Sequence, residues 1–355
     1  MTAEWDLLAN ATLHEIEEFA ANLLPSYAHD YYASGARDEQ TFRGNLAGWG
    51  RWWLVPRMLN DVSKVSLNTS VLGNAISVPL IVAPMAAQRM AHPLGELATA
   101  RAAAAAGTAM IVSTSTTTPI EEIGAVPGLT FFYQLYPWSD HDATIAMVER
   151  AIAAGAKAIV LTVDVTIDID PKRRPRGGLV TPDWVTYPMH HEGARVLLTL
   201  DWAYFKRLRD QVKVPIVVKG ILHPDDARRA IDAGADAIDV SNHGGRTLDG
   251  AIPTAEALPE VVEAVDGRVE VLVDGGIRRG VDILRALALG ARAVVVGRPF
   301  LWGLAVGGEA GSRRIFSILS SELEQDAAMA GVSDIRAVPR DLVRMSRLGL
   351  VPELR

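Results

Sequence analysis

The sequence contains no cysteine among its 355 residues. This absence excludes disulfide bonds, thiolate metal sites and cysteine nucleophiles, and it is compatible with a reducing compartment. Basic residues are also in the minority, since 35 Lys and Arg stand against 42 Asp and Glu for a net charge of −7. Because a nucleic-acid footprint needs clustered excess basic residues, we expect no nucleic-acid partner.

Long apolar runs are missing as well. No uninterrupted stretch approaches the roughly 20 apolar residues of a transmembrane helix. The N-terminal MTAEWDLLAN has neither the basic start nor the apolar core of a signal peptide. We therefore expect no membrane segment and a cytoplasmic location. Hydrophobic residues still make up 49% of the chain, which is ample material for a large globular core.

One short pattern recurs along the chain: an alanine-rich helix end, a glycine and an apolar strand. It occurs in AAAAAGTAMIVS, AAGAKAIVLTVD, DAGADAIDVSNH and ALGARAVVVGRP. Glycine directly after a helix favours a left-handed cap, and all-apolar strands are typical of a parallel sheet covered on both faces. Together with LIVAP, TFFYQLY, VPIVVKG and VEVLVDGG, the pattern predicts eight strands, near residues 80, 109, 130, 158, 214, 237, 270 and 293.

Eight strands that alternate with helices predict an α/β protein with a closed (β/α)8 TIM barrel. The alternative, an open Rossmann sheet, is disfavoured because no GxGxxG follows the first strand. We expect a single domain with an N-terminal helical extension (1–75), a barrel (76–310) and C-terminal helices (311–355).

The segments around the strands add three expectations. The sequence TLHE at 12–15 is typical of a capping box that begins a helix, which Pro25 then ends. Residues 311–332 have the pattern of a helix pair that closes the chain. The connection over 165–213 is much longer than the others and rich in proline, glycine and charge, so we expect an active-site loop or lid.

Polar side chains follow nearly every predicted strand, and in such barrels the active site lies at the C-terminal strand ends. His243 is the candidate general base, because the reference pKa of histidine lies near neutrality, and Asp164 could hold its tautomer. Lys219 follows the apolar PIVV; it could stabilise negative charge on a bound ring system, although a Schiff-base lysine and a solvent-exposed lysine are alternatives.

Two glycine-rich strand ends, DGGIRRG and GRP, follow the seventh and eighth strands. Loops at these positions frequently bind phosphate, which we favour over simple tight turns. The remaining histidines show no persuasive metal-ligand spacing, so no metal site is predicted. Tyr31 and Tyr32 lie in an apolar helix and, taken alone, are more typical of a core.

The set VSNHGGRTLDG, LVDGGIRRG, VKGI, LTVD, APMAAQRMAHP and DYYASGA resembles the FMN-dependent 2-hydroxy-acid oxidising family. That family includes glycolate, lactate and mandelate oxidases and dehydrogenases. The resemblance extends from about Ala28 to the C-terminal helices, and SNHGGR within a barrel is highly specific. It implies FMN as cofactor, a small α-hydroxy acid or derivative as substrate, and a homo-oligomer, a tetramer in the family.

The resemblance also implies residue roles. His243 would remove the hydroxyl proton, Asp164 would stabilise the imidazolium, and Arg246 would bind the substrate carboxylate with help from Tyr31 and Tyr136. Lys219 would lie against the flavin N1–O2 edge. The remaining FMN contacts would come from Pro84, Met85, Ala86, Ser113, Gln134, Thr162 and Ser241, and the phosphate contacts from Asp274, Gly275, Gly276, Arg278, Gly297 and Arg298.

The sequence departs from the family pattern after the fourth strand. The family usually has a Gly-Arg-Arg loop there, whose second arginine also grips the carboxylate, but Pro171 occupies the gap-free equivalent. Either a longer turn brings Arg173 or Arg174 into place, or the second clamp is absent. Asp168 and Asp170 would repel a carboxylate, and the lid is shorter than usual. We therefore expect a larger, aromatic, esterified or carrier-linked substrate.

Two other functions compete with oxidation of a hydroxy acid. One is an FMN barrel of another kind, such as an isomerase or a dihydroorotate-type dehydrogenase, but SNHGGR together with VKG disfavours it. The other is an inactive scaffold, which is disfavoured because every proposed catalytic position is occupied. For the electron acceptor we favour oxygen over a quinone.

Overall fold

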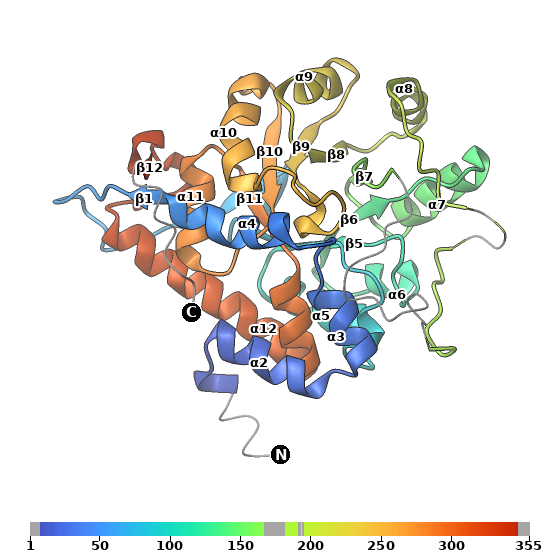
Figure 1. Ribbon diagram of the computed structural model, residues 1–355, viewed down its shortest axis with the longest axis horizontal. Coiled ribbons are helices and arrows are strands. Elements are labelled where there is room, and N and C mark those ends of the chain that lie inside the picture. The colour runs from blue at the N-terminus through green and yellow to red at the C-terminus, as the bar shows by residue number, and fades with distance from the viewer. Residues whose placement is uncertain (1–7, 167–181, 191–192, 194, 347–355) are drawn as a thin grey trace.

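The computed structural model describes residues 8–166, 182–190, 193 and 195–346. Its centre is a closed barrel of eight parallel strands (Figure 1). The strands are β4 (Leu80–Val82), β5 (Ala109–Val112), β6 (Thr130–Leu135), β7 (Ile159–Thr162), β8 (Ile216–Ile221), β9 (Ala237–Val240), β10 (Glu270–Asp274) and β11 (Ala293–Val296). Each predicted strand is therefore present, and the predicted (β/α)8 barrel is confirmed.

The barrel closes where β11 pairs with β4, with Val294 opposite Leu80 in register. Its interior is filled by small and branched side chains, which suits a packed core rather than a pore. The hairpin of β2 (Thr69–Val71) and β3 (Asn74–Ile76) shares this buried cluster through Val71 and Ile76. The barrel interior is thus plugged on the side opposite the strand carboxyl ends.

Helices cover the outside of the barrel (Figure 1). They are α5 (Gly95–Ala105), α6 (Ile120–Gly124), α7 (His141–Ala153), α8 (Trp202–Gln211), α9 (Pro224–Asp232), α10 (Thr254–Val265), α11 (Gly280–Ala288) and α12 (Arg298–Met329). The glycines of the recurring pattern have positive φ, for example 107° at Gly155. The predicted left-handed caps are confirmed, and they let each helix turn directly into the next strand.

The N-terminal extension forms α2 (Leu13–Leu23), α3 (Ser26–Ala33) and α4 (Gln40–Gly48). The predicted capping box is present, because the Thr12 side chain accepts from the Glu15 amide and the Glu15 carboxylate accepts from the Thr12 amide. Leu24 ends the helix directly before Pro25, as predicted. A short ribbon of β1 (Trp52–Leu54) and β12 (Val343–Met345) joins the extension to the C-terminal region.

The C-terminal helix pair expected over 311–332 is wrong in position. In the structure α12 begins at Arg298 and consists of two helical segments separated by a kink at Gly307 and Gly308, where φ/ψ leave the helical region. The kink lies before residue 311, and the rest of α12 is a single helix that packs beside α2 (Figure 1). The segment around Gly307 and Gly308 is rich in small residues, as are the helix ends elsewhere in the chain. The sequence pattern therefore did not locate the kink.

The long connection after β7 is described in part. Residues 167–181, which include Asp168, Asp170, Pro171, Arg173 and Arg174, lie outside the described residues, so the expectations placed on them stay predictions. The part close to α8 returns to the barrel through a bridge between Trp138 and Val196. Within the described ranges, no helix combines the length and apolarity that crossing a bilayer requires.

The kink in α12 generates a stability prediction. A β-carbon on Gly311 would lie 1.8 Å from the carbonyl oxygen of Gly303. Helix propensity alone would make Gly311→Ala stabilising by roughly 1 kcal/mol, but the clash should reverse the sign and cost about 1–3 kcal/mol. Urea unfolding measures this, with Glu324→Ala on the exposed face of the same helix as the control, expected to stay within about 0.5 kcal/mol. A stabilised Gly311→Ala variant would contradict the close packing.

Candidate active site

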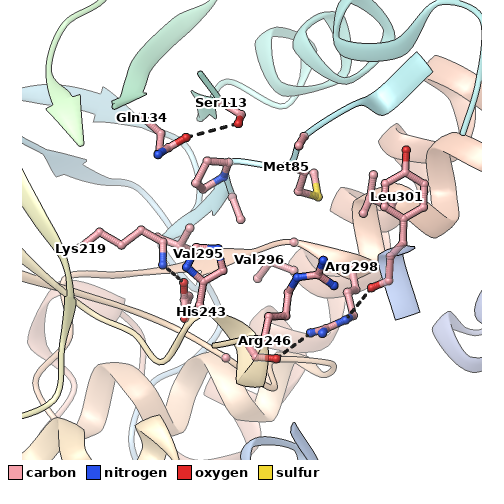
Figure 2. Close-up of a pocket in the computed structure, with 18 of the residues that line it drawn as sticks. Met85, Ser113, Gln134, Lys219, His243, Arg246, Val295, Val296, Arg298 and Leu301 are labelled. Atoms are coloured by element: carbon pink, nitrogen blue, oxygen red, sulfur yellow. Dashed lines mark hydrogen bonds and ion pairs between the residues drawn. The ribbon is translucent and has the colours of Figure 1, made fainter. Parts of the chain in front are cut away.

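A cavity lies at the carboxyl ends of the barrel strands (Figure 2). It encloses about 1050 Å³ of empty space, with open solvent at its mouth included. Of the predicted site residues, those that line it are Tyr31, Pro84, Met85, Ala86, Ser113, Gln134, Tyr136, Thr162, Lys219, His243, Arg246, Asp274, Gly275, Gly276, Arg278, Gly297 and Arg298. The other two, Asp164 and Ser241, contact lining residues through hydrogen bonds.

His243 is held between two partners. Its Nδ1 lies 2.8 Å from Oδ1 of Asp164, and its Nε2 lies 3.3 Å from the Tyr136 hydroxyl. His243 has a positive φ of 59°, a strained conformation that is typical of functional positions. A β-carbon on Gly220 would come within 2.7 Å of the Asp164 side chain, so the glycine of VKG makes room for the carboxylate that orients the histidine.

The electrostatics of this group favour a charged Asp164 and a neutral Tyr136. Burial alone would raise the pKa of Asp164, but His243 and Lys219 outweigh burial and hold the pKa below its usual value. Burial, reinforced by the charge of Asp164, raises the pKa of the Tyr136 hydroxyl. Tyr136 therefore stays protonated and can donate a hydrogen bond into the cavity.

Lys219 is only 3% exposed and lies at the floor of the cavity. Its ammonium pairs with Oδ2 of Asp274 at 2.7 Å and donates to the Ser241 hydroxyl, which in turn donates to Asp274 at 2.8 Å. Burial would lower the pKa of Lys219, but the carboxylates of Asp274, Asp239 and Asp164 raise it overall. The lysine is thus a fixed cation, which disfavours the Schiff-base alternative, since that chemistry needs a neutral amine.

Three arginines concentrate positive charge at another part of the cavity, and Figure 2 labels two of them, Arg246 and Arg298. Arg246 donates to the carbonyls of Tyr31 and Ser34, and Arg298 donates to the carbonyls of Tyr32, Ser34 and Gly244. Arg278 donates to the Ile277 carbonyl. Within the described ranges none of the three forms an ion pair with a carboxylate.

This concentration of charge has an electrostatic cost. Burial lowers the pKa of Arg298, and the charges of Arg246 and Arg278 lower it further. Burial likewise lowers the pKa of Arg278. Several half-buried guanidinium groups close together are unfavourable unless an anion joins them. The arrangement is therefore suited to anionic groups such as a phosphate and a carboxylate.

The opposite wall carries neutral polar groups. The Ser113 hydroxyl donates to the Gln134 side-chain oxygen at 3.3 Å, and the Gln134 amide donates to the Thr162 hydroxyl at 3.0 Å (Figure 2). All three side chains are buried. They form a preorganised strip of donors and acceptors against which a polar ring edge can bind.

The structure corrects one interpretation of the glycine-rich turns. Gly244 lines the cavity, but a β-carbon on Gly245 would lie 2.5 Å from the Phe42 amide of α4. A β-carbon on Gly276 would lie 2.0 Å from the carbonyl oxygen of Asn45. These glycines admit the N-terminal extension as well as a ligand, a requirement that the strand motifs alone do not reveal.

Sequence reasoning missed several lining residues: Tyr32, Ala83, Ser115, Ile277, Val295, Val296 and Leu301. Most are apolar residues of strands or adjacent turns, where nothing in the pattern distinguishes a cavity wall from core. Tyr32 was interpreted as core and is indeed buried, yet its hydroxyl donates to the Ala87 carbonyl at 2.6 Å beside the cavity.

The model of the FMN-dependent dehydrogenase family matches residues 20–345. The chain belongs to that family. Among its relatives, an L-lactate oxidase of Nostoc sp. is 47% identical over 94% of this chain and 98% of its own length. The human 2-hydroxyacid oxidase 1 is 42% identical over 95% of this chain and 97% of its own.

Solved structures give the same family. A mandelate oxidase in complex with benzoyl-formic acid superposes with a TM-score of 0.89 at 41% identity, over 94% of this chain and 98% of that one. FMN is the cofactor of this family of dehydrogenases, and the cavity fits it. The half-buried arginines, which pair with no carboxylate of the described residues, suit its phosphate. Lys219 with the polar strip of Gln134 suits the edges of its ring.

The arginine cluster generates a prediction about FMN binding. Loss of a charge-assisted hydrogen bond costs about 1.5–3 kcal/mol, so Arg298→Ala should raise the Kd for FMN roughly 10- to 100-fold. Riboflavin lacks the phosphate, so its Kd should change far less if Arg298 binds that group. Flavin fluorescence titration of the apoprotein measures both ligands, with Arg313→Ala on exposed α12 as the control. Equal losses for FMN and riboflavin would assign Arg298 a structural role instead.

Proposed function

We propose that this protein is an oxidase that converts an α-hydroxy acid into the 2-oxo acid and passes the electrons to oxygen. The observation that carries the proposal is the convergence of His243, Asp164 and Tyr136 beside Lys219 and Arg246 in one cavity. A base, a fixed cation and an anion-binding guanidinium are the groups that this oxidation needs.

His243 serves as the general base in this proposal. Its Nε2 faces the Tyr136 hydroxyl in the cavity and can accept the proton of the substrate hydroxyl. Its Nδ1 is directed to Asp164, whose lowered pKa keeps a negative charge beside the imidazolium that forms. Bound FMN would supply the acceptor for the hydride equivalent that leaves the substrate carbon.

Arg246 and Tyr31 orient the substrate. One guanidinium nitrogen of Arg246 donates hydrogen bonds to the backbone carbonyls of Tyr31 and Ser34. The Cζ atom of Arg246 lies 5.0 Å from the centre of the Tyr31 ring. The rest of the guanidinium is available to a carboxylate in a bidentate, charge-assisted pair. The protonated Tyr136 hydroxyl can donate a second hydrogen bond to the same substrate.

Anaerobic reduction tests this function. The purified protein should show the visible spectrum of oxidised flavin, which an α-hydroxy acid should bleach and oxygen should then restore. His243→Ala should keep its FMN but bleach on the order of 10²–10⁴-fold more slowly, as expected when a general base is lost. Stopped-flow absorbance records both half-reactions. A near-native bleaching rate in the variant would remove His243 from its role, and very slow return of colour would favour a different acceptor.

The proposed substrate is an aromatic or larger hydroxy acid or its ester. The small Ser115 lines the cavity, and its hydroxyl lies 3.1 Å from Nε2 of His190. Tyr187 stacks on that imidazole with ring centroids 4.7 Å apart, and Trp138 contacts it edge-on. Of these residues only Ser115 lines the cavity, and we propose that the aromatic group beside it receives an apolar substrate side chain. Burial lowers the pKa of His190, which favours its neutral form. A substrate side chain bound by such a wall depends less on a second arginine.

A series of substrates tests this preference. The kcat/KM for mandelate and a mandelate ester should exceed the values for lactate and glycolate. Ser115→Phe should reduce the value for mandelate more than that for glycolate, because bulk at this position occupies the space of the ring. If lactate or glycolate is preferred, and Arg173→Ala or Arg174→Ala sharply raises its KM, then the two-arginine clamp is intact and the preference is wrong.

Three expectations about the whole protein stay predictions. They are the single-domain organisation, a cytoplasmic location and a homo-oligomeric state, a tetramer by resemblance to the family. Light scattering of the FMN-loaded protein measures the oligomeric state.

A further inference from the structure

An acidic residue is buried within the barrel. Asp239 lies in the middle of β9, is 0% exposed, and stands opposite Lys219 of β8 and Leu272 of β10 in the parallel registers. Within the described part of the chain, neither of its carboxylate oxygens has a hydrogen-bond partner. Burying an ionised carboxylate without a hydrogen-bond partner costs free energy. The proposed reaction does not use this residue.

The surroundings of Asp239 contain more acid than base. Lys219 is already paired with Asp274 at 2.7 Å, and Asp164 is paired with His243 at 2.8 Å. Asp239 is therefore the third acid of this group, and among the described residues it has no cation to itself. Its nearest cation is the same Lys219 that stands at the floor of the cavity.

These charges determine how readily Asp239 binds a proton. Burial raises the pKa of Asp239 well above its usual value; Lys219 opposes this shift, whereas Asp274 and Asp164 add to it. Because all these groups are close and poorly solvated, any new charge beside Lys219 changes the proton affinity of Asp239.

We propose that Asp239 is a positioning residue that sets the charge Lys219 presents to the flavin, and that it takes up one proton when the flavin becomes an anion. The proposal rests on FMN lying with its ring against Lys219, as the proposed function has it. Lys219 stabilises the ionised form of Asp239. Negative charge on the flavin ring offsets the charge of Lys219 and repels the carboxylate, so the ionised form of Asp239 becomes less favourable. Proton uptake by Asp239 then preserves the compensating charge for the flavin.

The balance of the reaction is simple. Oxidation of the hydroxy acid forms a C=O bond and releases one hydride, which the flavin takes, and one proton, which His243 takes. Asp239 binds a separate proton that comes from solvent. By linkage, the flavin is reduced more easily when Asp239 is protonated than when it is ionised.

The midpoint potential of FMN-loaded protein as a function of pH tests this coupling. One extra proton per two electrons adds about 30 mV per pH unit to the slope, because tenfold in the equilibrium constant of a two-electron couple corresponds to about 30 mV. The wild-type potential should show this steeper segment within the pH range in which the protein retains FMN. Asp239→Asn should lack it, should coincide with wild type at the acidic end and should lie higher at the alkaline end.

Asp326→Asn is the matched control. Asp326 also has a raised pKa, but it lies on α12 beside Glu322 and Arg279 rather than near Lys219. This variant should keep the wild-type slope. A purely structural role for Asp239 would lower stability or FMN content without removing the steeper segment.

Infrared difference spectra of the FMN-loaded protein give a second measurement. Reduction of the flavin should produce a carboxylic-acid C=O band that shifts in D2O, and Asp239→Asn should lack that band where it loads FMN. The inference is overturned if wild-type protein shows no such band, or if wild type and Asp239→Asn have the same slope. If the substrate bleaches the flavin normally in that case, the proposed function stands and only the role of Asp239 fails.

Discussion

Closure of the barrel through the pairing of β11 with β4 is the constraint on which the site depends. All eight strands are parallel, so their carboxyl ends meet at one rim, and residues far apart in sequence become neighbours there. Asp164 and His243 are separated by 79 positions, yet their side chains lie 2.8 Å apart. Neither residue needs a loop of its own to find the other, since each follows directly from a buried strand.

The N-terminal extension is a structural part of this rim. Asn45 of α4 exchanges two side-chain hydrogen bonds of 2.8 Å with Asn242, and Trp49 donates to the Gly275 carbonyl. These contacts hold the turn before His243 and the turn after β10 in fixed positions. The glycines at 245 and 276 are required for the close approach of α4. The turns that line the cavity and the N-terminal extension are therefore packed as one structural unit.

Sequence patterns could predict the strands, the barrel and the residues at the strand ends, because each follows from local chemistry. A buried apolar run followed by a polar residue needs no knowledge of distant contacts. The kink in α12, the packing of Gly245 on Phe42 and the cavity wall at Ser115 depend on which segments meet in space. The sequence does not indicate a role for Asp239 for the same reason, because the importance of one acid within an apolar strand depends on which residues surround it in space.

Charge in this barrel is separated by depth. Arg246, Arg278 and Arg298 lie around the cavity and form no ion pair with an acid in the part of the chain that the structure describes. The acids Asp274 and Asp239 instead surround Lys219 at and beneath the cavity floor. Anionic groups are therefore attracted to the arginines. Near Lys219 the carboxylates partly offset the positive charge, and their protonation can change when a new charge enters the cavity. A fixed cation alone would stabilise negative charge on a flavin to the same extent at every pH. A cation backed by a titratable acid stabilises it to an extent that follows the proton concentration, which makes the floor of the cavity as important to the chemistry as the residues that touch the substrate.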